Sequence, residues 1–86
     1  MTLDDVKKLI KEENLKLHNL EAGQPLREEQ VVSRFEGGEW SVFATDERAS
    51  IVTGSIFKYK IEAEAVESFL KRLRAANNLL KSYSSN

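Results

Sequence analysis

The stretch QVVSRFEGGEWSVFAT, residues 30–45, decides the fold of this 86-residue chain. Two runs rich in Val, Phe, Trp and Thr flank Gly37 and Gly38, and such runs around a two-residue glycine turn are typical of a β-hairpin. The turn determines which residues lie opposite each other. We therefore expect six cross-strand pairs: Glu36 with Glu39, Phe35 with Trp40, Arg34 with Ser41, Ser33 with Val42, Val32 with Phe43, and Val31 with Ala44.

Side chains alternate between the two sides of a strand, so this register divides the hairpin into two faces. We expect one face to point into the core, and it carries Val31, Phe35, Trp40, Val42 and Ala44. We expect the opposite face to stay open, with Val32 beside Phe43 and Arg34 beside Ser41. A shared core is predicted for Phe35, Trp40, Phe69 and Leu73.

The segment before the hairpin predicts a helix from about Leu3 to Asn14, because its apolar residues follow helical spacing. Thr2 and Asp5 resemble a capping box at its start, and Asn14 suits a left-handed stop. The leucines within residues 15–20 suggest a first strand, although leucine is not a strong strand former. Residues 21–29 contain Gly23 and the single proline and indicate a loop.

The segment after the hairpin begins with a polar stretch, residues 45–50, which indicates a turn. A further strand is predicted over roughly residues 51–60, broken or bulged at Gly54. From Glu62 onward the apolar period is helical, and residues 82–86 are expected to be a frayed tail. The prediction is an α+β fold in one domain, residues 1–86: an antiparallel three- or four-stranded sheet with N- and C-terminal helices packed on one face, in the order α-β-β-β(-β)-α.

Composition limits what the chain can do. It has no cysteine and one histidine, which excludes a disulfide scaffold, cysteine-based zinc sites and thiol catalysis. The sequence has no apolar run long enough for a membrane span and no signal-peptide core at its start, so we expect a cytoplasmic protein. Net charge is −1, but residues 21–50 hold seven acids and three bases, whereas residues 51–86 hold six bases and three acids. An acidic middle argues against nucleic-acid binding and favours a basic partner.

Catalytic signals are weak. His18 stands in an apolar stretch without an orienting neighbour, and the adjacent acid pairs lack the spacing of a metal loop. The Gly37-Gly38 pair has neither dinucleotide-binding nor phosphate-loop context. The element order resembles a double-stranded-RNA-binding domain, but acidic Glu62 and Glu64 replace the lysines that would grip phosphate. We therefore predict no enzyme activity, no catalytic residues, no cofactor and no metal.

Two features indicate a protein-binding surface. Glu36 and Glu39 form a like-charge pair across the turn, which costs the hairpin stability without visible compensation. The expected open face offers an apolar anchor between this pair and a second acidic turn. The predicted partner-binding residues are Val32, Glu36, Glu39, Phe43, Asp46 and Glu47. At about 3.3 Å per residue, the two acidic clusters would lie roughly 25 Å apart, so we expect one partner to span the strand between them.

A resemblance supports the same interpretation. The stretches WSVFATDERAS (40–50) and SIFKYKIEAEAVESFLKRLRAAN (55–77) resemble small immunity proteins of bacterial polymorphic-toxin systems, and within them the family catalogued as immunity protein fifty-nine. The shared features are the tryptophan strand running into Thr45-Asp46-Glu47-Arg48 and the closing helix; Ala49 stands where glycine is expected. The resemblance implies a cytoplasmic protein that binds and neutralises a cognate toxin domain. The alternatives are a small regulatory or adaptor domain that self-associates through its sheet, hence a homo-oligomer, and, least favoured, an enzyme using paired carboxylates.

Overall fold

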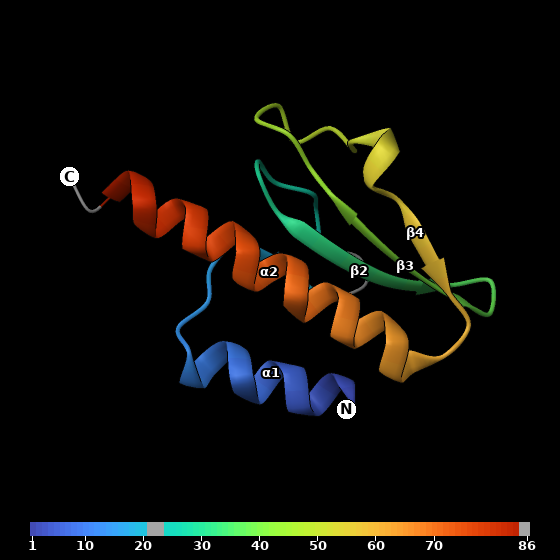
Figure 1. Cartoon of the computed structure of the whole chain (residues 1–86). Helices are drawn as coiled ribbons and strands as arrows, with labels where there is room; N and C mark the ends of the chain where they lie inside the picture. The colour runs from blue at the N-terminus through green and yellow to red at the C-terminus, as the bar shows by residue number, and fades with distance from the viewer. Residues whose placement is uncertain (21–23, 85–86) are drawn as a thin grey trace.

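The computed structural model describes residues 1–20 and 24–84, with side chains through residue 80. The chain forms α1 (Leu3–Glu12), β1 (His18–Asn19), β2 (Val31–Glu36), β3 (Glu39–Ala44), the 3-10 turn η1 (Thr53–Ser55), β4 (Phe57–Tyr59) and α2 (Glu62–Ser84). The four strands make one sheet in the order β1-β2-β3-β4. Helix α2 lies across one face of the sheet, and α1 runs beside α2 (Figure 1). The predicted α+β class is confirmed.

The hairpin of β2 and β3 has the predicted register at all six pairs, from Glu36 opposite Glu39 to Val31 opposite Ala44. Gly37 and Gly38 have φ angles of 60° and 80°, in the left-handed region that a tight two-residue turn requires. Because these angles cost glycine nothing sterically, the turn forms without strain.

The sheet is mixed, so the prediction of a purely antiparallel sheet was wrong at one edge. Strand β1 pairs with β2 in parallel, with His18 opposite Val31 and Asn19 opposite Val32. A parallel pair needs a long return connection. Residues 24–30 are the described part of that connection and lead the chain to the start of β2, whereas residues 21–23 of the predicted loop lie outside the described residues.

Helix α1 has the predicted capping box. The Asp5 amide donates to Thr2 Oγ1 at 3.3 Å, and the Thr2 amide donates to Asp5 Oδ2 at 2.9 Å. Hydrogen bonding from the Thr2 backbone amide, and after it from the Thr2 side chain, holds the pKa of the Asp5 carboxyl below its usual value. The helix ends two residues earlier than predicted, at Glu12, and Asn14 takes the expected left-handed conformation with φ 52°.

Strand β4 and helix α2 also agree in outline with the elements predicted from the sequence. Gly54 lies in η1, which interrupts the predicted strand and leaves an isolated bridge between Thr45 and Ile51 before β4 begins. Helix α2 starts at the predicted Glu62 but continues to Ser84, so residues 82–84 are helical where a frayed tail was expected; residues 85 and 86 lie outside the described residues.

The hydrophobic core lies between α2, α1 and one face of the sheet. Its buried members are Val6, Ile10, Val31, Val42, Ala65, Val66, Phe69 and Leu73. Trp40 packs against this cluster while only partly buried. Phe35 was predicted to share the core, but its side chain is 56% exposed. The hairpin turn projects beyond the first turn of α2 (Figure 1), so the end of the core-side face has no helix above it.

Candidate protein-binding surface at the hairpin tip

The tip of the β2–β3 hairpin displays an aromatic pair. The rings of Phe35 and Trp40 lie opposite each other in the register, with centroids 4.8 Å apart and planes tilted by 33°. Trp40 also packs against the core, whereas Phe35 remains more than half exposed. The pair is therefore anchored on one side and available on the other.

Two carboxylates flank the aromatic pair on the opposite side of the ribbon. Glu36 is exposed and Glu39 is half-buried, and they face each other across the turn as predicted. Strand alternation sends the glutamates away from α2 and the aromatics toward it. We use the term hairpin tip for these four side chains, Phe35, Glu36, Glu39 and Trp40, together with the two turn glycines.

The predicted apolar anchor is not available at the surface. Val32 is fully buried and Phe43 is 8% exposed, so the expectation of an open outer face was wrong for these two residues. The returning segment explains it, because Leu26 and Gln24 lie with Phe43 around a shallow hollow on this face, which Ile51 also lines. Apolar residues that looked unpartnered in the sequence are covered by the chain's own connection.

A buried polar network holds that segment in place. The Asn19 side chain, fully buried, donates from Nδ2 to the Pro25 carbonyl at 3.2 Å and to Gln30 Oε1 at 3.0 Å. The Gln30 amide donates to Thr45 Oγ1 at 2.7 Å, and that hydroxyl donates to the Arg27 carbonyl at 2.6 Å. The network joins β1, the segment of residues 24–30 and the end of β3 through buried and partly buried hydrogen bonds.

Arg34 closes the same network from the outer face of β2. Its Nη2 donates to Asn19 Oδ1 at 2.6 Å and to the Gln24 carbonyl at 3.0 Å, while Nη1 donates to the Asn19 carbonyl at 3.3 Å. Burial lowers the pKa of this guanidinium, and the charge of Glu36 opposes the shift. Arg34 thus acts as a structural cation that also offsets part of the glutamate charge at the tip.

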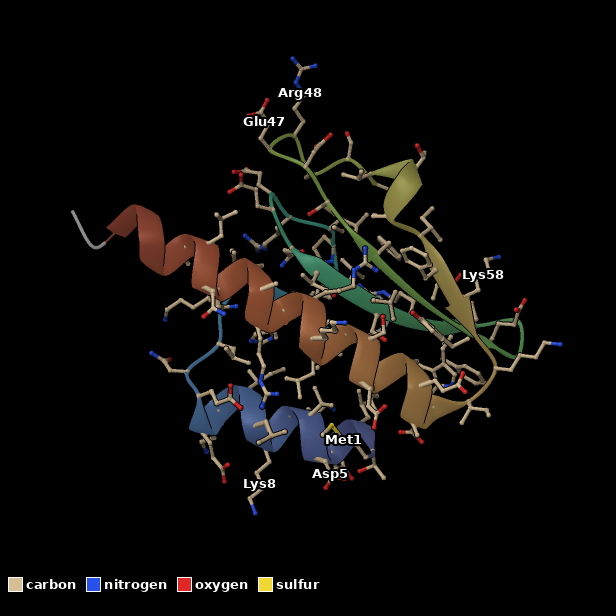
Figure 2. The ribbon with its side chains drawn as sticks, in the orientation of Figure 1. Met1, Asp5, Lys8, Glu47, Arg48 and Lys58 are labelled. Carbon is tan, nitrogen blue, oxygen red and sulfur yellow. The ribbon has the colours of Figure 1, made fainter. Side chains whose placement is uncertain are left out.

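The second acidic cluster lies at the other end of β3. Asp46 Oδ1 accepts hydrogen bonds from the Arg48 amide at 2.8 Å and the Ser50 amide at 3.0 Å, so this carboxylate shapes the turn. Glu47 projects from the turn together with Arg48 (Figure 2). Ala49 has φ 62°, a conformation that glycine adopts more easily. A contact spanning both acidic clusters would cross the covered part of the outer face, so the structure does not join them into one apolar-centred surface.

The hairpin-tip residue whose surroundings the sequence analysis predicted wrongly is Phe35, which was assigned to the core, whereas Trp40 packs against the core as expected. The exposure of Phe35 depends on where α2 starts relative to the turn, and strand alternation alone does not contain that information. His18 is exposed at the surface. Within residues 1–20 and 24–84, no group of three or more metal-ligating side chains comes together, and no helix is both long and apolar enough to cross a membrane.

Comparison of this chain with protein-family models, with curated proteins and with solved structures found no match in any of the three.

Proposed function

We propose that this chain is an immunity protein, which binds a cognate bacterial toxin domain in the cytoplasm and neutralises it by protein–protein contact. Two lines of argument support the proposal. One is the resemblance of residues 40–50 and 55–77 to such proteins. The other is the hairpin tip, which has the chemistry of a protein-binding site. In this proposal the chain uses no catalytic residue, metal or cofactor of its own.

The observation that carries the proposal is the exposed Phe35 ring stacked on Trp40 beside Glu36 and Glu39. Aromatic side chains dominate binding energy at protein interfaces because they bury a large area at little conformational cost. Trp40 holds Phe35 in place before binding, which lowers that cost further. An exposed, pre-positioned aromatic ring is therefore a good interface anchor.

The two glutamates indicate the chemistry of the partner surface. Like charges directly opposite on a hairpin destabilise it. A basic partner surface would relieve this repulsion on binding and would also speed the encounter through long-range attraction. The proposed toxin surface therefore combines an apolar pocket for Phe35 with lysine or arginine side chains around it.

The proposal predicts that a gene beside the gene for this chain encodes a toxic domain, and that domain is the partner for the test. Co-expression of the chain should restore growth to cells that produce the domain, and the purified pair should bind. Phe35→Ala should weaken binding by more than about fivefold, which corresponds to over about 1 kcal/mol. Reversal of both charges, Glu36→Lys with Glu39→Lys, should mainly slow association, and more so at low salt.

Matched controls are available on α2, away from the tip. Leu79→Ala removes an apolar side chain that is 58% exposed, and Glu67→Lys reverses an exposed acid. Both should leave protection and binding unchanged. Failure of the wild-type chain to protect would refute the immunity function, whereas protection that survives the tip variants would move the contact to another surface.

The alternative, a regulatory or adaptor domain that self-associates through its sheet, makes a different demand on the structure. Helix α2 covers one face of the sheet, and residues 24–30 lie over the hairpin part of the other. Association would therefore have to use a sheet edge, and β4 is the longer of the two edges. Sedimentation velocity distinguishes the two functions, since the immunity proposal needs no dimer and the alternative does.

A further inference from the structure

Strand β4 forms an open edge of the sheet. It pairs with β3 on one side only, and the strand order ends with it. An unpaired edge presents backbone donors and acceptors that another extended segment can use. The opposite edge is the two-residue β1, so β4 is the longer of the two edges.

The direction of the backbone groups along β4 follows from the hairpin. In a two-residue hairpin the residues flanking the turn exchange both hydrogen bonds, and bonded pairs then alternate with non-bonded pairs. Glu39, Ser41 and Phe43 therefore bond toward β2, whereas Trp40 and Val42 bond toward β4. Trp40 pairs with Tyr59 and Val42 with Phe57, so the N–H and C=O groups of Lys58 point to the open edge.

The two sides of this edge differ in chemistry. On the α2 side lies Phe57, 53% exposed, with the Arg72 guanidinium 5.3 Å from its ring centroid. Arg72 also donates to the carbonyls of Val42 and Ser55, so it holds a fixed position above the ring. On the other side Lys58 projects from the strand into solvent (Figure 2). A segment added here would meet an apolar ring on one face and an ammonium group on the other.

Lys58 discriminates between possible occupants. Two copies of β4 paired about a two-fold axis at Lys58 would place the two ammonium groups opposite each other, which is unfavourable. No ion pair among the described residues involves Lys58. The charge at the edge therefore disfavours a second copy and favours an acidic side chain opposite Lys58.

We propose that the β4 edge accepts an extended acidic segment of a partner protein by strand addition. An Asp or Glu of that segment lies opposite Lys58 and exchanges both backbone hydrogen bonds with it, and apolar neighbours of that acid cover Phe57 and Tyr59. This surface is distinct in charge from the acidic hairpin tip, and the inference does not depend on the immunity function.

The probe is a blocked peptide, acetyl-Thr-Val-Glu-Val-Thr-amide, titrated to millimolar concentration into ¹⁵N-labelled protein. Amide resonances of residues 56–60 should shift, and exchange of the Lys58 amide with water should slow. Lys58→Pro removes the N–H that faces the open edge without removing a β3–β4 hydrogen bond, so the fold should persist and binding should disappear. The comparison peptide has Lys in place of the central Glu, and the wild-type protein should bind it more weakly than the Glu peptide. Lys58→Glu should reverse this preference, so that the Lys peptide binds about threefold more tightly.

Several outcomes would overturn the inference. They are an absence of shifts at millimolar peptide, shifts that survive Lys58→Pro, and a peptide preference that Lys58→Glu leaves unchanged. The charge-reversal variant keeps the test decisive if the proline variant does not fold. Broadening of the same amides with protein concentration, without peptide, would assign the edge to a second copy and would also contradict the proposal.

Discussion

Two phenylalanines on the same side of the sheet have opposite environments. Phe69 lies on α2 in the centre of the core and is fully buried, whereas Phe35 lies at the end of β2 and is 56% exposed. Removing a buried aromatic ring loses its transfer energy and leaves a cavity that the surroundings fill only in part. Removing an exposed ring loses little more than its contact with a neighbour.

At this scale we predict that Phe69→Ala lowers the free energy of unfolding by about 3–5 kcal/mol, enough to unfold most of the protein. Phe35→Ala should cost about 1 kcal/mol, the contribution of its ring contact with Trp40. Urea denaturation of both variants measures the difference. Equal losses would mean that Phe35 belongs to the core after all, and the hairpin tip would then be unsuitable as a binding site.

The element that organises the sheet is the β2–β3 hairpin, and its turn depends on backbone conformation more than on space. A Cβ atom added at Gly37 or Gly38 would meet no atom within 4 Å, so no clash prevents a side chain there. The constraint is the positive φ of both residues, which L-residues adopt only at a cost. Gly54, in η1, also has open space around it but no positive φ.

Gly37 and Gly54 provide a matched test, because both have open space but only Gly37 has a positive φ. Gly37→Ala should destabilise the protein by about 1–2 kcal/mol, because alanine pays for the left-handed conformation. Gly54→Ala should be neutral or slightly stabilising, because alanine restricts the unfolded chain and fits the space. Thermal melts of the two variants make the comparison, and a Gly54→Ala loss as large as that of Gly37→Ala would contradict the conformational explanation.

At the scale of the whole molecule, the parallel strand β1 and the segment of residues 24–30 determine which surface is exposed. That segment covers the outer face of the hairpin, and Asn19 holds it there through Pro25, Gln30 and Arg34. A buried amide with all of these partners is costly to replace, since its removal leaves several polar groups without a hydrogen bond.

We predict that Asn19→Ala destabilises the protein by about 1–3 kcal/mol and releases the covering segment. Amide hydrogen exchange should become faster over residues 24–30, and exposure of Phe43 should increase binding of a hydrophobic dye. Asn78→Ala, at an exposed asparagine on α2, is the control and should change neither. Unchanged exchange over residues 24–30 would show that packing, and not this network, holds the segment.

What the sequence alone determined is local. The Gly37-Gly38 turn sets all six cross-strand pairs, because a two-residue loop permits one register and strand alternation then sorts the side chains. The same local rules predicted the Thr2–Asp5 capping box and the start of α2 at Glu62.

The tertiary structure decided which of the sorted side chains reach solvent. Phe43 is buried because residues 24–30 cross its face, and Phe35 is exposed because α2 does not extend over the turn. Both outcomes depend on contacts between segments distant in the chain, which neither spacing nor alternation encodes.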